Sequence, residues 1–194
     1  MECKVAVLGC DGVGKTSIVT RFITGHFVEE HDPTIDEDDY RRQISVDGQI
    51  CMLDILDACG EVGEFSAMRE QYMRVAQGFV LVYSISDLDT FNKINACYDE
   101  VVRVKDSHGK RVPVVLVGNK CDLEEEKRQV AREQGEELAR QLNCPFLETS
   151  AKENIRIDDI FAEIVRKLNA QHLPSASVEE SKKKSKFLGF FKRK

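Results

Sequence analysis

A glycine-rich segment lies near the start of the chain, between an apolar run and a stretch with helical periodicity. This segment, Gly9–Thr16, reads G-C-D-G-V-G-K-T and fits the pattern G-x-x-x-x-G-K-[ST]. The run Lys4–Gly9 predicts a strand before it, and Gly14–Thr24 predicts a helix after it. Glycines let a backbone curl so that its N–H groups point at phosphate oxygens, and the helix N-terminus adds positive potential. The segment therefore predicts a phosphate-binding loop, in which Lys15 bridges two phosphates and Thr16 binds Mg²⁺. The alternative is a tight turn before a helix.

Strand-like and helix-like stretches alternate along the rest of the chain. Strands are expected at Tyr40–Val46, Gln49–Asp57, Gly78–Ser84, Val112–Gly118 and Pro145–Thr149, and helices near Leu88–Lys105, Gln129–Leu142 and Ile155–Ala170. Asp47-Gly48 joins the first two strands and is typical of a hairpin turn, because both positions accept positive φ. The alternation predicts an α/β fold, with a six-stranded, mainly parallel sheet, one antiparallel edge strand and helices on both faces. Ligands of such sheets bind at the carboxyl ends of the strands.

Charge is distributed unevenly between the body of the chain and its C-terminal end. Residues 171–194 contain seven Lys/Arg and two Asp/Glu, a net charge of +5; the other residues contain 21 against 32, a net charge of −11, and the sum is −6. A nucleic-acid-binding domain needs a basic face, so the acidic body argues against a nucleic-acid partner. The proline and small residues of Leu173–Ser177 predict a boundary between one domain, residues 1–170, and a flexible basic and aromatic tail, residues 171–194.

The cysteines and the apolar runs indicate the compartment. The seven cysteines are scattered and form no C-x-x-C pair, which favours reduced, mostly buried thiols over disulfides or a metal site. No run approaches the roughly 18 apolar residues that a membrane span needs. The start of the chain lacks the apolar core of a secretory signal. We therefore expect a cytoplasmic protein.

Two further polar segments follow predicted strands and indicate which base is bound. A carboxylate at the end of Asn119-Lys120-Cys121-Asp122 accepts hydrogen bonds from N1–H and the exocyclic amine of guanine, whereas adenine has an acceptor at N1. Leaving that carboxylate unpaired disfavours the wrong base. Ser150-Ala151-Lys152 follows the next strand and is placed to close over the base. The order of the three segments predicts a guanine-nucleotide site.

The chain resembles the Ras subfamily of small GTPases over about residues 3–170. The resemblance is carried by the segments above and by Asp32–Ile35, Leu53–Asp57 and Ser66–Arg69. It implies a monomeric protein with a Ras-like P-loop GTPase domain, which binds GTP or GDP with Mg²⁺ and hydrolyses GTP. It also implies an exchange factor, a GTPase-activating protein, and effectors that contact the first switch loop and the adjacent edge strand.

The resemblance also implies a role for each matching residue. The nucleotide-binding positions are Asp11, Gly12, Val13, Gly14, Lys15, Thr16, Ser17, Phe27, Val28, Glu29, Thr34, Gly60, Asn119, Lys120, Asp122, Ser150, Ala151 and Lys152. The Mg²⁺ ligands would be Thr16, Thr34 and, through water, Asp57. The catalytic group would be Lys15, Thr34, Gly60 and Glu61. The two loops around Thr34 and Gly60 would be ordered by GTP and released by GDP.

Two departures from the family concern hydrolysis. Asp11 stands where Ras and Rap have glycine, next to the γ-phosphate and the space used by an activating protein's arginine finger. Glu61 and Val62 follow Gly60, where the family usually has a water-positioning glutamine, and Asp57–Phe65 is one residue longer than its Ras counterpart. These departures predict tight GTP binding, slow hydrolysis and a weak response to activating proteins. The alternative is neutral drift on an ordinary enzyme.

A third departure concerns partners. Ile35–Tyr40 carries one more residue than the Ras effector loop, and His31 replaces the usual tyrosine beside the nucleotide. An extra residue next to an edge strand shifts which side chains face outward, so the effectors are expected to differ.

Three functional hypotheses follow from these residues. The first is a Mg²⁺-dependent GTPase that switches between two loop conformations. The second is a hydrolysis-deficient docking module that stays loaded with GTP, which Asp11 and Glu61 favour. A P-loop kinase is disfavoured, because the chain offers no lid for a second substrate and Asp122 selects guanine.

The tail suggests where the protein acts. Ser181–Lys194 has seven basic residues that bracket Phe187, Leu188, Phe190 and Phe191, and the family's C-terminal prenylation cysteine is missing. Basic and aromatic residues together predict reversible binding to an anionic membrane surface, on the cytoplasmic face. A nuclear-import signal and a solvated tail are the alternatives.

Overall fold

The computed structural model describes residues 1–28, 38–58, 67–105, 112–123 and 125–172. Its elements follow in the order β1 (Glu2–Leu8), α1 (Lys15–Thr24), β2 (Asp38–Val46), β3 (Gln49–Asp57), α2 (Ala67–Val75), β4 (Gly78–Ser84), α3 (Leu88–Asn92), α4 (Ile94–Lys105), β5 (Val114–Asn119), the 3₁₀ helix η1 (Glu125–Lys127), α5 (Arg132–Leu142), β6 (Phe146–Thr149) and α6 (Ile157–His172). Strands and helices alternate from β4 onward, as the sequence pattern predicts.

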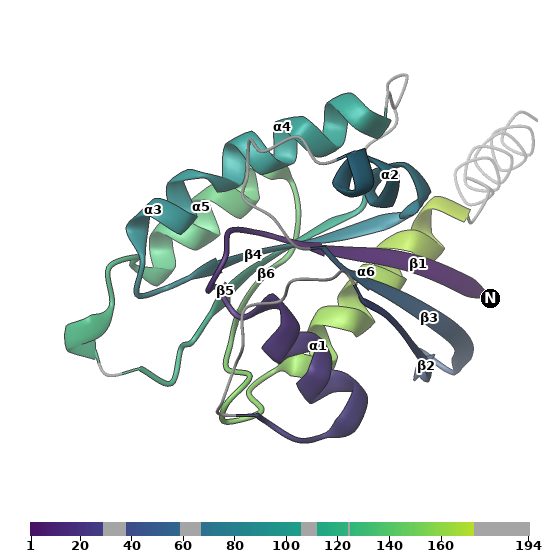
Figure 1. Cartoon of the computed structure of the whole chain (residues 1–194), viewed down its shortest axis with the longest axis horizontal. Coiled ribbons are helices and arrows are strands. Elements are labelled where there is room, and N and C mark those ends of the chain that lie inside the picture. The colour runs from purple at the N-terminus through teal and green to yellow at the C-terminus, as the bar shows by residue number, and fades with distance from the viewer. Residues whose placement is uncertain (29–37, 59–66, 106–111, 124, 173–194) are drawn as a thin grey trace, which may run out of the picture.

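The six strands form one sheet in the order β2-β3-β1-β4-β5-β6 (Figure 1). β1 pairs in parallel with β3 and β4, and β5 pairs in parallel with β4 and β6, whereas β2 runs antiparallel to β3 at the edge. In the hairpin between β2 and β3, Asp47 and Gly48 have φ of 51° and 79°, the left-handed conformation expected of this turn. The predicted α/β fold, with its antiparallel edge strand, is confirmed.

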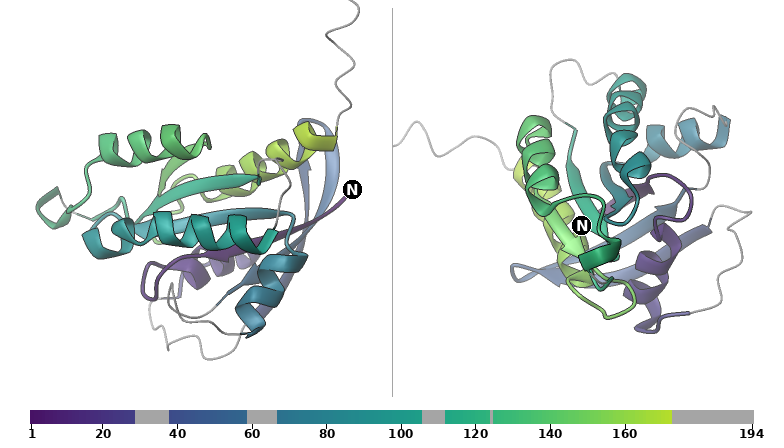
Figure 2. Two further views of the ribbon diagram at one scale, coloured as in Figure 1. Left: turned by 90° about the horizontal axis from the view of Figure 1, so that it is seen from above. Right: turned by 90° about the vertical axis from the view of Figure 1, so that its left-hand side faces the viewer.

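Helices cover both faces of this sheet, over two hydrophobic clusters. α1 and α6 pack on one face, against side chains that include Val7 and Val82. α2, α4 and α5 pack on the other face, against side chains that include Leu8 and Leu81. Figures 1 and 2 show these layers from three directions. Every residue of β4 is buried, because a strand between two helical layers has no side that faces water. The loops after the central strands are thus held at one edge of a rigid sheet.

The stretch predicted as one helix, Leu88–Lys105, is two helices. α3 and α4 meet at Lys93, whose N–H is shared between the carbonyl oxygens of Asp89 and Phe91. Shared hydrogen bonds of this kind mark the end of a helix. The expectation of an uninterrupted helix was therefore wrong, although both pieces lie where the periodicity predicts.

α5 and α6 begin later than their patterns suggest. α5 begins at Arg132 rather than near Gln129, because the N–H of Gln129 donates to the carbonyl oxygen of Ile85. α6 begins at Ile157, because Ile155 belongs to a short antiparallel bridge. Within the described ranges, no helix is both long and apolar enough to cross a membrane.

α2 has no counterpart in the sequence expectation. Its buried positions include Arg69 and Met73, spaced i and i+4, and Ala76, which directly follows the helix, is buried as well. Arg69 is only 1% exposed, and its guanidinium lies 3.5 Å from the Glu100 carboxylate of α4. A charged residue at an inward position interrupts the apolar periodicity by which amphipathic helices are recognised.

The described cysteines are free thiols. Burial raises the pKa of Cys3 and Cys97 to about 12 and that of Cys144 to about 11. These side chains therefore remain protonated near neutral pH and pack as small apolar residues. Cys59 lies outside the described residues.

Candidate functional site

The predicted phosphate loop, Gly9–Thr16, leaves the carboxyl end of β1 and runs into the first turn of α1. Gly14 is the N-cap of α1, with φ of 93°. A Cβ at Gly14 would lie 2.5 Å from the side-chain amide nitrogen of Asn119, and a Cβ at Gly9 would lie 2.2 Å from the carbonyl oxygen of Val82. A side chain fits at neither position, so the loop presents backbone at the N-terminus of a helix, as a phosphate site requires.

The Lys15 side chain lies over this loop and is 7% exposed. Its ammonium donates to the carbonyl oxygens of Gly9 and Cys10, both at 3.0 Å. The same ammonium lies 3.6 Å from the carboxylate of Asp11, a side chain that is 66% exposed. The loop thus holds a positive charge where the phosphates are expected to bind.

The base loop, Asn119–Asp122, follows β5 and contacts the phosphate loop directly. The Asn119 side-chain nitrogen donates to the carbonyl oxygen of Val13 at 2.9 Å. The Lys120 ammonium donates to the carbonyl oxygen of Gly12 at 2.6 Å. Lys120 has φ of 69°, a conformation that non-glycine residues adopt rarely and that often marks a functional loop. Two segments more than 100 residues apart in sequence are therefore bonded into one surface.

The closing loop, Ser150–Lys152, is held against the base loop. The N–H of Cys121 donates to the carbonyl oxygen of Thr149 at 3.0 Å, and the Thr149 hydroxyl donates to the Asn119 side-chain oxygen at 3.2 Å. The Ser150 hydroxyl accepts from the N–H of Glu153 at 2.9 Å, which stabilises the turn after it. Ser150 and Ala151 are buried, whereas Lys152 is exposed. The three predicted segments adjoin one another and form one continuous surface at the carboxyl edge of the sheet.

A buried ion pair lies behind these loops, and the sequence analysis did not find it. The Arg128 guanidinium donates to both oxygens of the Glu148 carboxylate, at 2.6 and 3.3 Å, and to the carbonyl oxygen of Val130 at 3.1 Å. The two side chains are 17% and 10% exposed. Glu148 directly precedes Thr149, so this pair holds the last residues of strand β6, just before the closing loop. No spacing in the sequence marks the pair, because its members lie 20 residues apart on different elements.

Two of the three predicted Mg²⁺ ligands are described. Thr16 lies in the first turn of α1, and Asp57, which is 2% exposed, ends β3. β3 pairs in parallel with β1, and Asp57 lies opposite Val7, just before the phosphate loop. Hydroxyl and carboxylate oxygens are the donors that Mg²⁺ prefers, and it commonly takes few protein ligands beside phosphate and water. The donor set fits Mg²⁺ bound together with a nucleotide.

The remaining predicted site residues fall into two groups. Phe27 is half-buried against the cluster beneath α1, Ser17 is half-buried on α1, and Val28 is 57% exposed. Glu29, His31, Thr34, Gly60, Glu61 and the tail from Leu173 onward lie outside the described residues.

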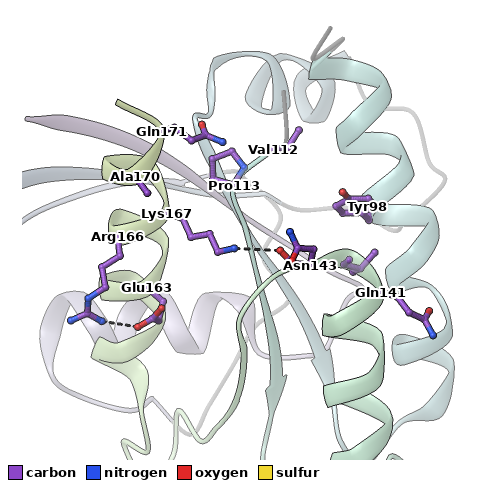
Figure 3. A pocket seen from close by; sticks show the side chains of 11 residues that line it. Tyr98, Val112, Pro113, Gln141, Asn143, Glu163, Arg166, Lys167, Ala170 and Gln171 are labelled. Carbon is purple, nitrogen blue, oxygen red and sulfur yellow. Dashed lines mark hydrogen bonds and ion pairs between the residues drawn. The ribbon is translucent and has the colours of Figure 1, made fainter. Parts of the chain in front are cut away.

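A separate cavity of about 640 Å³ lies at the opposite end of the sheet (Figure 3). Tyr98, Pro113, Asn143 and Lys167 are among its lining residues, and the Lys167 ammonium donates to the carbonyl oxygen of Asn143. Pro113 and Asn143 precede β5 and β6, so this cavity is at the amino ends of these strands. The predicted nucleotide residues all lie on other segments.

The comparison with known families agrees with this geometry. Residues 4–170 match the model of the Ras family. The match includes all three loops and every helix and strand from β2 to β6. Members of this family bind GTP and GDP, generally with Mg²⁺, which the donor groups above can accommodate. The chain belongs to the Ras family, and it is a small GTP-binding switch protein and GTPase.

Proposed function

We propose that this protein is a slow switch, which binds Mg²⁺ and GTP and signals to effectors for longer than an ordinary family member. Asp122 would select guanine, the phosphate loop and Lys15 would hold the phosphates, and Thr16 and Asp57 would hold Mg²⁺. The metal would neutralise charge on the phosphates. Loops around Thr34 and Gly60 would carry the signal.

The position of the Asp11 side chain is the observation that best supports slow GTP hydrolysis. Its carboxylate lies 3.6 Å from the Lys15 ammonium, in a loop where a family member needs only backbone. A negative charge there opposes the charge that develops on the transferred phosphoryl group, and the side chain takes up space beside it. Glu61 would add to the effect, because a carboxylate has no amide donor with which to orient water.

Single-turnover GTP hydrolysis tests this proposal. We expect Asp11→Gly to hydrolyse GTP about 10-fold or more faster than the native chain, or to become sensitive to an activating protein. Glu136→Gln is the control, because it removes one negative charge from an exposed (i, i+4) ion pair on α5. Equal, ordinary rates for the native chain and Asp11→Gly would show a conventional timed switch.

A second candidate is a docking module that remains loaded with GTP on a membrane. Asp11 and Glu61 favour it, since both changes act against hydrolysis. Hydrolysis too slow to measure in the native chain, with GTP retained after purification, would favour this candidate over a slow switch.

The partners proposed for this protein follow from its surface. β2 is the edge strand of the sheet, and Asp39, Arg41, Gln43 and Ser45 alternate outward along it. An exposed edge strand can pair with a strand of an effector, and these side chains would select it. We propose a monomer, regulated by an exchange factor and weakly by an activating protein. The tail would bind it to an anionic membrane on the cytoplasmic face.

A further inference from the structure

The Lys15 ammonium has three N–H donors, and the phosphate loop itself supplies carbonyl acceptors for two of them. Two donors bond the carbonyl oxygens of Gly9 and Cys10 at 3.0 Å. The Asp11 carboxylate lies 3.6 Å from the same ammonium, at ion-pair distance but beyond the range of a hydrogen bond. Carbonyl oxygens carry no net charge, so Asp11 supplies the anion for an ammonium that is only 7% exposed.

We propose that Asp11 competes with the nucleotide phosphates for Lys15, and so weakens nucleotide binding and speeds release. The proposal rests on the nucleotide site described above and concerns release rather than hydrolysis. A carboxylate and a phosphate are both anionic acceptors and use the same donors of a lysine. The Asp11 carboxylate therefore competes with a phosphate oxygen for the same ammonium.

Binding of a nucleotide then has two costs that a glycine at this position avoids. The phosphate must first replace Asp11 as the partner of Lys15. The displaced carboxylate next remains within the same short loop as the phosphates, and like charges at close range repel each other. A triphosphate carries more charge than a diphosphate, so the preference for GDP over GTP increases as well.

The size of the effect follows from exposure. Asp11 is 66% exposed, so water and salt screen its interactions with both Lys15 and the phosphates. Exposed pairs of this kind change equilibrium constants by up to about five-fold. The effect is large enough to measure and small enough to leave the site functional.

The consequence for the switch is a short-lived complex with GDP. A nucleotide that leaves faster is replaced sooner by the GTP of the surroundings, even without an exchange factor. Where GTP is in large excess over GDP, faster release of GDP together with slow hydrolysis would raise the share of the protein that carries GTP, in spite of the stronger preference for GDP. Asp11 would then act on both halves of the cycle.

The test measures release of a fluorescent GDP from the full chain, native and Asp11→Asn, at low and high salt. We expect release to slow about two- to five-fold in Asp11→Asn, with a smaller difference at high salt. Affinity for a non-hydrolysable GTP analogue should rise at least as much as affinity for GDP. The nucleotide-free variant should melt no higher than the native chain, because its lysine has lost an ionic partner.

Glu136→Gln and Asp11→Gly complete the experiment. Glu136 forms an exposed (i, i+4) pair with Arg132 on α5, so its loss matches the change in charge and in pairing at another place. We expect native release rates from Glu136→Gln and slowed release from Asp11→Gly. The proposal is overturned if neither Asp11 variant slows release, or if Glu136→Gln slows it equally. If the native chain binds no guanine nucleotide, the nucleotide site itself is wrong.

Discussion

The side-chain amide of Asn119 joins the phosphate loop to the end of β6, just before the closing loop. Asn119 uses both ends of its amide, donating to the carbonyl oxygen of Val13 and accepting from the hydroxyl of Thr149. The side chain is 2% exposed, and a buried amide with both ends paired is costly to replace. Asn119 therefore connects the phosphate loop to the closing loop, although its motif is usually associated with the base.

Tyr83 and Gly135 make a second close contact, beneath the base loop. A Cβ at Gly135 of α5 would lie 2.4 Å from the Phe146 ring and 2.5 Å from the Tyr83 hydroxyl oxygen. We predict that Gly135→Ala lowers the free energy of unfolding by about 1–3 kcal/mol through overpacking, although alanine is the better helix former. Denaturant unfolding measures the loss.

The same contact supplies a matched background for that variant. Tyr83→Phe removes the hydroxyl, whose oxygen has no hydrogen-bond partner among the described residues. Gly135→Ala should therefore cost less in Tyr83→Phe than in the native chain. An equal loss of stability in both backgrounds would show that the new methyl group does not clash with the Tyr83 hydroxyl.

At the level of elements, the loops depend on charges that hold neighbouring segments together. Arg128 and Glu148 join the segment before α5 to the end of β6. Arg69 and Glu100 join α2 to α4, and Arg166 of α6 binds the Asp47 carboxylate of the β2–β3 hairpin. The hydrogen bonds from Arg166 lower the pKa of Asp47, so acid weakens that contact. Each pair fixes a loop or helix relative to the sheet.

The pair behind the closing loop gives a prediction about binding as well as stability. Glu148→Gln leaves the largely buried guanidinium of Arg128 without a carboxylate. We expect a loss of about 1–3 kcal/mol in the free energy of unfolding, below the range for fully buried pairs. We also expect faster release of GDP, because Thr149 and Ser150 follow directly.

Thermal unfolding and GDP release, measured on the same samples, check this expectation. Glu153→Gln is the control, because this exposed carboxylate follows the closing loop and, within the described ranges, forms no ion pair with another element. A variant that loses stability but releases GDP at the native rate would limit the pair to a structural role.

For the molecule as a whole, charge separates the domain from the tail. The body carries −11 and residues 171–194 carry +5, so the tail is the part that an anionic surface would attract. An acidic body is repelled by the same surface, which would favour contact through the tail alone. The orientation of the switch loops on a membrane would then depend on α6, from which the tail continues.

Binding to vesicles tests this assignment. We predict that replacing Lys182, Lys183 and Lys184 with glutamine lowers binding to vesicles containing phosphatidylserine by up to about 100-fold, since each lysine contributes up to about 1 kcal/mol. Sedimentation with the vesicles measures the bound fraction, and added salt should weaken native binding.

The control variant removes the same number of positive charges, but from residues of the domain instead of the tail. Glutamine at Lys93, Lys127 and Lys167 should leave vesicle binding nearly unchanged. Equal losses from both triple variants would show that net charge, and not the tail, determines binding. Native binding that is insensitive to salt would favour another role for the tail, such as nuclear import.

Much of this architecture could be predicted from local patterns. Apolar runs marked every strand, Asp47-Gly48 marked the hairpin, and the spacing in Gly9–Thr16 marked the phosphate loop. These features depend on residues that are neighbours in sequence, so backbone preferences and periodicity are enough to reveal them. The base loop and the closing loop each follow a predicted strand, and this placed them at the carboxyl edge of the sheet.

Contacts between distant segments required the folded chain. The bonds from Asn119 to Val13 and from Lys120 to Gly12, and the burial of Arg69, arise because packing brings segments together that share no local pattern. Arg69 also explains why α2 escaped prediction, since its charge interrupts the apolar face of that helix. Asp11 belongs to both cases. The sequence alone shows an aspartate at this position. Its pairing with Lys15, four residues later, depends on the folded loop, which curls so that the Asp11 carboxylate faces the Lys15 ammonium.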